Sequence, residues 1–423
     1  MGKPKIRFKG FTEEWEQRKL GDYSELITKG TTPSCFCEDG DVTFVKIEAL
    51  REKRVVKELC SAISEEIHKR ELARSILKED DIVFAIAGAT VGKCAVITGN
   101  ILPANTNQAL AIIRLKTNIN RDFVYFSLTS KQMEIYINQS KSIGAQPNLS
   151  LAQMNAFEFL CPCQKEEQQK IGDYFSALDH LITLHQRKCD ETKKLKKYML
   201  QKMFPQNGMK VPEIRFEGFT GDWEQRKLGE TLYSLRNNTL SRAELSLENG
   251  VAKNVHYGDI LVKFGEILDV KKELLPMIVD ELVLAKYRDS FLQNGDIVIA
   301  DTAEDETVGK CSEIAGVSDE KIIAGLHTIP CRPLFNFASG YLGYYLNSDD
   351  YHRQLLPLMQ GIKVTSISKS ALQDTKIQYP KSLEEQEQIG TYLRWLGHLI
   401  TLHQRKRDEL VKIKKYMLQN MFV

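Results

Sequence analysis

The stretch HLITLHQRK occupies residues 180–188, and the same nine letters return at residues 398–406. Each copy sits inside a longer match, because segments 166–204 and 384–422 agree at 27 of 39 positions without a gap. A second pair, PKIRFKGFTEEWEQRKL (4–20) and PEIRFEGFTGDWEQRKL (212–228), agrees at 13 of 17 positions. Repetition over this length indicates a chain built from two copies of one plan.

The repeated segments have the period of a long helix with a narrow apolar stripe. Apolar or seam-compatible side chains recur at steps of three and four, which is typical of a coiled-coil seam. A helix of about 39 residues is roughly 58 Å long and cannot bury such a stripe alone. We expect the other copy to be its partner, and two long helices each packed on its own domain are the alternative. The predicted seam residues are Ile171, Leu178, Ile182, His185, Leu195 and Met199 in the first copy, and Ile389, Leu396, Ile400, His403, Leu410, Ile413 and Met417 in the second.

The longer units beside these helices mix strands and helices. Short β-rich runs, such as DVTFVKI (41–47) and DIVFAIA (81–87), are broken by Gly, Asn and Asp turn residues, which predicts an α+β fold. The two units align only in patches, so a repeated framework carries diverged residues. That pattern suggests one scaffold doing the same job on two different ligands. We expect a globular domain at 1–162, a long helix at 163–205, a second globular domain at 206–380 and a second long helix at 381–423.

Composition places the chain among ordinary soluble proteins. It is 42% hydrophobic and 27% charged, and no run approaches the roughly 18 to 20 apolar residues of a membrane span. The start, MGKPKIRFKG, has no apolar signal core. Nine cysteines, an odd number, fit reduced thiols better than a disulfide framework, so we expect a cytoplasmic protein. The Cys35/Cys37 and Cys161/Cys163 pairs lack a second pair at zinc spacing, and we expect no metal site.

Charge is distributed unevenly along the chain, although the formal net charge is only +2. The helical segments are basic, with 9 basic and 6 acidic residues in 163–205 and 8 and 5 in 381–423. Segment 206–380 has 19 basic and 25 acidic residues. Any binding of DNA must therefore rest on local patches instead of a bulk field.

Catalytic motifs do not emerge from the sequence. GATVGKC (88–94) resembles a phosphate-binding loop, but three residues separate its glycines where that loop needs four, and Cys94 stands in place of the hydroxyl. A β-turn ending in a lysine is the favoured interpretation. His180 and His185 are five residues apart, about 140° around a helix, so they do not share a metal-binding face. The acidic cluster at 301–306 has no carboxylate counterpart in the first unit, and a solvated or base-reading loop is favoured there.

Several motifs, taken in order, resemble those of one known family. They are GTTPS (30–34), DIVFAIAGATVGKCAVI (81–97), LEEQEQIGTYL (383–393) and the repeated LITLHQRK. Over nearly the whole chain they resemble the specificity subunit of type I restriction-modification systems. The resemblance implies two target-recognition domains, each reading half of a split, asymmetric double-stranded DNA sequence. It also implies that the two long helices form an antiparallel coiled coil with a pseudo-twofold internal repeat.

The same resemblance implies the partners. Two methyltransferase subunits would dock on the helices, and motor-nuclease subunits would join them to complete the restriction enzyme. S-adenosylmethionine, ATP and Mg²⁺ would reside on those partners, with no cofactor on this chain. The chain would then choose where methylation and cleavage apply and catalyse neither.

Candidate DNA contacts are polar residues of the loops, since base edges are read by Arg, Lys, Asn, Gln, Ser and Thr. An ordinary surface or turn role is the alternative for each. The four lysines at 193, 194, 196 and 197 are expected on a solvated helix face in preference to phosphate binding. The candidates are Thr31, Thr32, Ser34, Lys93, Asn107, Gln108, Gln146 and Asn148 in the first unit, and Arg236, Asn237, Asn238, Arg242, Lys310, His327, Lys363 and Thr365 in the second.

Two other function classes are open on the sequence. A repeat-built adaptor that binds two proteins and no nucleic acid is favoured by the acidic second unit. An NTPase using the 88–94 loop is disfavoured by its spacing.

Overall fold

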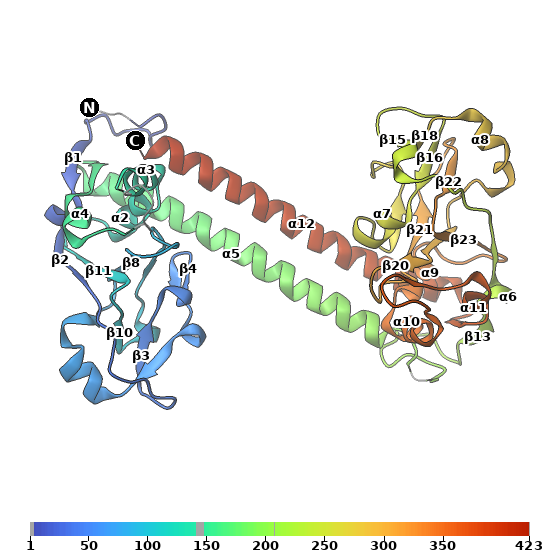
Figure 1. The fold of residues 1–423 in the computed structure, drawn as a ribbon, viewed down its shortest axis with the longest axis horizontal. Coiled ribbons are helices and arrows are strands. Elements are labelled where there is room, and N and C mark those ends of the chain that lie inside the picture. Colours follow the sequence, from blue (N-terminus) through green and yellow to red (C-terminus); the bar gives the residue numbers. More distant parts are fainter. Residues whose placement is uncertain (1–3, 141–147, 207, 423) are drawn as a thin grey trace. The chain divides into compact units, whose positions relative to one another are not determined.

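The computed structural model describes residues 4–140, 148–206 and 208–422, and the chain forms two compact units. Unit 1 combines Met1–Gln186 with Arg405–Val423, and unit 2 is Arg187–Gln404. Both boundaries fall inside the long helices α5 (Lys165–Lys202) and α12 (Leu383–Met421), which are labelled in Figure 1. Each unit therefore contains one globular domain together with part of both helices.

The two helices pack against each other inside each unit. In unit 1, Leu178 and Ile182 of α5 share a buried core with Leu410 and Met421 of α12, and Figure 1 shows the C-terminal end of α12 beside α5. In unit 2, the Sγ atom of Cys189 lies 4.0 Å from the carbonyl oxygen of Ile400. Early residues of one helix meet late residues of the other, so the pair is antiparallel. The predicted antiparallel coiled coil in an α+β protein is confirmed.

The helices also pack on the globular domains. The ring of Phe175 in α5 lies 5.0 Å from that of Phe126 in α2 (Arg121–Leu128). In unit 2, Ile389, Leu393 and Leu396 of α12 belong to the same core as Tyr341 of α9 (Tyr341–Leu346). The sequence left open whether each long helix packs on the other helix or on a globular domain. Both occur, because each helix has one face for its partner helix and another for a domain.

The seam prediction needs one correction in each helix. Leu195 and Ile413 are 42% and 44% exposed, so they do not lie in the seam. The inward positions alternate by four and three from residue 171 to 203 and from 389 to 421, which brings Lys196 and Lys414 inward instead and turns their neighbours outward. The other predicted seam residues are buried (Ile171, Leu178, Ile182, Ile389, Leu396 and Leu410) or half-buried (His185, Met199, Ile400, His403 and Met417).

Unit 1 is built around two four-stranded sheets. The first, in the order β2-β11-β8-β9, is wholly antiparallel. The second, β6-β3-β10-β7, contains one parallel pair between β3 and β10. The sequence run DIVFAIA supplies β8, whose four residues are all buried, as expected for a strand covered on both faces.

The elements of unit 1 have the following bounds. Its strands are β1 (Glu16–Lys19), β2 (Ser24–Lys29), β3 (Val42–Val45), β4 (Leu50–Arg51), β5 (Arg54–Val55), β6 (Ser61–Ile63), β7 (Ile76–Leu77), β8 (Ile82–Ala85), β9 (Cys94–Val96), β10 (Ala104–Thr106), β11 (Leu110–Leu115) and β12 (Glu158–Cys161), and its short helices besides α2 are α1 (Leu20–Tyr23), α3 (Lys131–Gln139) and α4 (Leu151–Ala156).

Unit 2 repeats this plan with one added strand. Its larger sheet has the order β14-β23-β19-β21-β17, and its second sheet the order β15-β18-β16-β22. The strands are β13 (Glu224–Lys227), β14 (Leu232–Ser234), β15 (Leu245–Ser246), β16 (Ala252–Val255), β17 (Ile267–Asp269), β18 (Met277–Ile278), β19 (Ile297–Ala300), β20 (Thr302–Ala303), β21 (Cys311–Ala315), β22 (Ile322–Ala324), β23 (Thr328–Pro333), β24 (Thr365–Ser366) and β25 (Lys376–Tyr379), and the helices besides α9 are α6 (Leu228–Thr231), α7 (Tyr257–Val262), α8 (Glu281–Ala285), α10 (Asp349–Leu355) and α11 (Lys369–Gln373).

A buried ion pair ties each N-terminal repeat to the start of a long helix. Arg7 Nε lies 2.6 Å from Glu167 Oε1, and Arg215 Nε lies 2.7 Å from Glu385 Oε1. A buried tryptophan donates its Nε1–H to the same carboxylate oxygen at 3.3 Å in both units. The guanidinium binds both carboxylate oxygens, a geometry that gives strong and directional hydrogen bonds. The repeated PxIRFxGF and EEQ sequences therefore encode the same joint twice.

Among the residues that the structure describes, no helix is long and apolar enough to cross a membrane.

Candidate nucleic-acid interface

Loops from four strands leave the β2-β11-β8-β9 sheet of unit 1 at a single edge. Because neighbouring strands are antiparallel, the ends of β2 and β8 lie beside the beginnings of β11 and β9. The loops at this edge contain the GTTPS turn, the turn from 86 to 93, and residues 107–109. We call this the strand edge of unit 1. It collects candidate residues that lie as much as 117 positions apart, from Thr31 to Asn148.

Polar side chains from separate loops bind one another at this edge. The Thr32 hydroxyl donates to Gln108 Oε1 at 2.7 Å, and the guanidinium of Arg74 donates to the hydroxyl oxygen of Thr31 at 3.2 Å. Ser34 donates to a carboxylate oxygen of Glu71 at 2.8 Å. These contacts fix exposed donors and acceptors in place, which is what a surface that reads base edges requires.

The remaining candidates of unit 1 line the same edge. Lys93 is exposed, and its carbonyl oxygen accepts the N–H of Ala85 at 2.7 Å. Asn107 uses its Oδ1 to cap a turn, accepting the N–H of Ala109 at 3.1 Å. Asn148 is exposed and forms a backbone bridge with Ala87. Gln146 lies outside the described residues.

Sequence reasoning missed two groups at this edge. Arg74 lies 43 residues from its partner Thr31, and no local pattern connects them. Phe36 is 47% exposed, and the ammonium of Lys46 lies 4.1 Å from the centre of its ring. An exposed aromatic ring three residues after GTTP is a signal that could have been noticed, since rings and nearby cations favour contact with nucleic acid.

The corresponding edge of unit 2 carries different side chains on the same framework. There, β14 and β19 end beside the beginnings of β23 and β21. Arg236 is exposed after β14, and Asn237 donates from Nδ2 to the carbonyl oxygen of Gly325 at 3.2 Å. Thr365 lies in β24, which pairs with β20 just beyond β19, and Lys363 is exposed in the preceding turn.

His327 is held in an unusual conformation at this second edge. Its φ of 54° lies in the left-handed region, which costs energy for a residue other than glycine. Its Nδ1 lies 3.3 Å from Thr302 Oγ1 and 3.5 Å from Asp301 Oδ1, and its ring packs edge-on to Tyr257 at 5.2 Å. Three neighbours hold this exposed imidazole, and the sequence indicated neither Thr302 nor Tyr257 as a partner.

Two candidates of unit 2 form hydrogen bonds inside the domain. Asn238 is completely buried, and its Nδ2 donates to Asn254 Oδ1 at 2.6 Å and to the Ala324 carbonyl at 2.9 Å, so its role is structural. The ammonium of Lys310 donates to the carbonyl oxygen of Leu261 at 2.7 Å, and burial lowers its pKa.

Arg242 stays half exposed, although it forms an ion pair with Asp259 at 2.5 Å. Asp259 lies in α7, two residues after the Tyr257 that packs on His327. Arg242 is thus linked to the strand edge of unit 2 through α7.

Two observations bear on the phosphate-loop and metal alternatives. The turn from 86 to 93 closes as a hairpin, in which the N–H of Gly92 donates to the Ala85 carbonyl at 3.0 Å. That amide is therefore not available to cradle a phosphate, unlike those of a P-loop. Within the described part of the chain, no three His, Cys, Asp or Glu side chains gather as metal ligands would.

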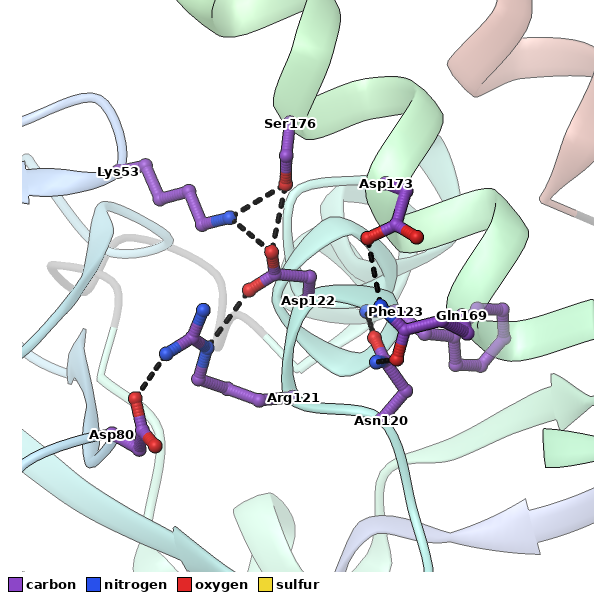
Figure 2. Close-up of polar contacts among 9 residues, drawn as sticks. All are labelled: Lys53, Asp80, Asn120, Arg121, Asp122, Phe123, Gln169, Asp173 and Ser176. Carbon is purple, nitrogen blue, oxygen red and sulfur yellow. Dashed lines mark hydrogen bonds and ion pairs between the residues drawn. The ribbon is translucent and has the colours of Figure 1, made fainter. Parts of the chain in front are cut away.

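A polar joint fixes the domain of unit 1 on α5, as Figure 2 shows. Asp122 binds the ammonium of Lys53 at 2.6 Å, the Arg121 guanidinium at 2.8 Å and the Ser176 hydroxyl of α5 at 2.7 Å. Burial alone would raise the pKa of Asp122, but these three donors outweigh it and the pKa is lowered. The neighbouring Asn120 donates to Gln169 of α5 at 2.6 Å. The strand edge thus belongs to a domain that is hydrogen-bonded to the helix.

Comparison with known families shows which family this duplicated chain belongs to. The model described as the type I restriction modification DNA specificity domain matches this chain twice, over residues 12–194 and 220–412. The chain belongs to that family. It is a specificity subunit, and recognition of a DNA target is its function, as the sequence predicted. The comparisons give the adaptor alternative no support.

Relatives of the family match over nearly their full length. The MjaVIII specificity subunit of Methanocaldococcus jannaschii is 26% identical over 418 residues, covering 96% of this chain and 91% of the relative. The putative MjaX specificity subunit of the same organism is 25% identical, with coverage of 96% and 92%.

Solved structures of the family share the fold. The S subunit from M. genitalium has a TM-score of 0.57 at 14% identity, with 99% of both chains covered. A chain from a study of complex assembly and conformational transition of the type I R-M system has a TM-score of 0.54 at 18% identity, with 96% and 97% covered.

Proposed function

We propose that this specificity subunit reads a bipartite, asymmetric DNA target, one half with each strand edge, and that it catalyses no reaction itself. One observation carries the proposal: the two edges occupy the same place on the same framework and present different side chains. Thr31, Thr32 and Gln108 face one half-target, and Arg236, Asn237 and His327 face the other. Different side chains at matched positions select different bases, so the two halves of the target differ.

We propose further that two copies of a methyltransferase subunit dock on the long helices, one per unit. Leu195 and Tyr198 are exposed on the helices of unit 2, and Ile413 and Tyr416 are exposed at the same repeat positions in unit 1. Leu195 with Tyr198, and Ile413 with Tyr416, therefore form one outward apolar patch in each unit. A matching pair of patches supports two identical partners. S-adenosylmethionine, ATP and Mg²⁺ belong to the methyltransferase and motor-nuclease subunits in this proposal.

The acidic excess of segment 206–380 fits this division of labour. Several of its carboxylates are used inside the unit: Asp296 pairs with Arg332, Asp259 with Arg242, and Glu266 with Lys196. Phosphate contacts normally supply much of the affinity for DNA. We therefore expect basic partner subunits to contribute much of that attraction, while this chain contributes selectivity.

Exchange of one domain tests the division of the target. Residues 21–160 are replaced by the equivalent segment of a relative with another target, and the methylated sites in cells are mapped. We expect one half of the target to change and the other to stay. A change in both halves, or in neither, would refute the proposal that each strand edge reads one half of the target.

A matched pair of point variants sharpens the assignment. Thr32→Ala with Gln108→Ala should relax selection in one half-target, and Arg236→Ala with His327→Ala in the other. The loss for each bidentate or paired contact is about 1–3 kcal/mol. Footprinting of the complex with its methyltransferase measures it, and protection of no defined sequence by the unaltered complex would defeat the proposal. The purified chain alone should transfer no methyl group and hydrolyse no ATP.

A further inference from the structure

One repeat position of the long helices carries a lysine in both units, and this lysine pairs with a different carboxylate in each unit. Lys196 of α5 and Lys414 of α12 occupy equivalent repeat positions and both face inward. Each ammonium lies over the ring at the same position of the neighbouring domain helix, 5.2 Å from Tyr344 in unit 2 and 5.6 Å from Phe126 in unit 1. The cation and the aromatic ring are thus retained in both copies.

The carboxylate comes from a different element in each unit. In unit 1, Lys414 pairs with Asp179 of α5 at 2.5 Å. The repeat position of Asp179 is Gly397 in unit 2, so the facing helix has no carboxylate there. Lys196 instead pairs at 2.7 Å with Glu266, which precedes β17 of the domain.

The domain residue at the position of Glu266 has the opposite charge in unit 1. The carbonyl oxygen of Glu266 accepts the N–H of Glu313 at 2.9 Å, and the carbonyl oxygen of Lys53 accepts the equivalent N–H of Val96 at 2.9 Å. Lys53 is therefore the counterpart of Glu266. Its ammonium pairs with Asp122 of its own domain and binds Ser176 of α5 at 2.8 Å (Figure 2).

The helix residues near Lys53 and Glu266 also differ between the two units. Arg394 occupies the repeat position of Ser176, and its guanidinium donates to the Ser339 carbonyl at 2.9 Å. Lys196 and Glu266 are 16% and 24% exposed, and Lys414 and Asp179 are 22% and 12% exposed. Removing one partner from a largely buried pair leaves a poorly solvated charge without its counter-ion, which is destabilising.

We propose that these residues form a position code that matches each reading domain to its own part of the duplicated helices. A domain with lysine at position 53 fits helices that carry Asp179 and Ser176. A domain with glutamate at position 266 fits helices that carry Gly397 and Arg394. Domain 1 placed in unit 2 would leave Lys196 without the carboxylate that Asp179 supplies in unit 1. It would also place Lys53 and Arg394 together at the single carboxylate of Asp122. The code therefore keeps the two domains in order on helices that are otherwise nearly identical. Only the functional consequence of that order, which half-target each unit reads, rests on the proposed function.

The first test supplies the missing carboxylate from the other element. Glu266→Gln should lower the thermal unfolding midpoint of the full chain by roughly 5 °C, since Lys196 loses its partner. Adding Gly397→Asp should restore most of that loss, because a Cβ at 397 meets its nearest atom, the Lys196 ammonium, at 3.8 Å. His398→Asp adds the same charge at the exposed neighbouring residue and should not restore it. A midpoint unaffected by Glu266→Gln, or equal recovery with both aspartates, overturns the proposal.

The second test places domain 1 in both units. Residues 21–160 replace 229–378, once with the helices unchanged and once with Arg394→Ser and Gly397→Asp. We expect the unchanged version to unfold at a lower temperature and the adapted version to recover. Equal midpoints overturn the position code.

The DNA target of the adapted version keeps the two proposals separable. Under the proposed function its two half-targets should be alike, since both domains are the same. Unlike half-targets would count against the proposed function alone, and the unfolding temperatures would still decide the code.

Discussion

The two units are alike where a domain joins the helices at their N-terminal ends and unlike where the strand edges face outward. The Arg7–Glu167–Trp15 and Arg215–Glu385–Trp223 joints match to 0.1 Å in their ion-pair distances, 2.6 and 2.7 Å. At the strand edges, Thr31 of unit 1 and Asn238 of unit 2 make the equivalent backbone bond and yet differ in burial. The contacts that join a domain to the helix are thus the same in both copies, and those at the strand edges have diverged.

Breaking the shared joint should have the largest effect, and it should be equal in both units. Glu167→Ala and Glu385→Ala each remove the carboxylate that a largely buried guanidinium and a buried indole N–H bind, while Arg215 keeps the Gly221 carbonyl as an acceptor at 2.8 Å. We expect a loss of about 3–5 kcal/mol in the free energy of unfolding for each variant. Urea denaturation followed by circular dichroism measures the loss, and a difference above about 1.5 kcal/mol between the two would show that the joints are not equivalent.

Asn238 and Thr31 should separate stability from recognition. Asn238→Ala removes two donors and an acceptor from a buried site and should cost about 1–3 kcal/mol of stability. Thr31→Ala changes a half-buried hydroxyl bound by Arg74 and should change stability by less than about 0.5 kcal/mol. Denaturation curves test the first expectation, and mapped methylation sites should show a change for Thr31→Ala. Equal losses of stability would mean that the unit 1 edge is also a structural network.

The sequence predicted what repeats and what is periodic. The 27 identities in 39 positions revealed the paired helices, and steps of three and four placed most of the seam. Periodicity failed at Leu195 and Ile413, where an apolar residue lies beside a lysine that takes the inward position. A lysine that faces inward needs a partner for its charge. Here a carboxylate and a ring meet each ammonium, and those partners come from other parts of the chain.

The candidate residues were predictable as loop residues, but the place where those loops meet was not. The structure brings them together because antiparallel neighbours place their turns side by side. The bond between Thr32 and Gln108 joins residues 76 positions apart, and the burial of Asn238 depends on Asn254 and Ala324. Such pairings follow from the packing of two sheets, which the spacing of residues along a single strand does not encode.

The outward patches should affect partner binding without affecting the fold. Tyr198→Ala and Tyr416→Ala each truncate an exposed ring, and exposed tyrosines are frequent anchors of protein interfaces. We expect each to weaken the docking of one methyltransferase copy by about 1–2 kcal/mol while the melting temperature stays the same. Native mass spectrometry of the complex should show loss of one copy for either variant and of both copies for the double variant. Retention of both copies by the double variant would place the docking surface elsewhere.

The smallest expected difference between the units concerns pH, and it has opposite signs in the two. In unit 1, the donors around Asp122 lower its pKa, so its stabilising contribution is complete above about pH 4 and is lost as the pH falls through the folded-state pKa. In unit 2, a glycine at 340 replaces that aspartate, and the nearby carboxylate is Glu313, which accepts the N–H groups of Gly340 at 2.5 Å and Gly343 at 3.0 Å. Burial raises the pKa of Glu313 more than these bonds lower it, so Glu313 favours the folded state increasingly as the pH falls through its folded-state pKa.

Acidification should therefore weaken unit 1 relative to unit 2. Amide hydrogen exchange between pH 7 and pH 4, corrected for the intrinsic rate at each pH, follows the two units separately in the full chain. We expect protection to fall more around α2 than around α9. Asp122→Asn should reduce stability at pH 7 and remove most of the acid-dependent loss around α2, because the asparagine does not titrate. If α2 in that variant lost protection on acidification as the unaltered chain does, the pH dependence of unit 1 would have to come from groups other than Asp122.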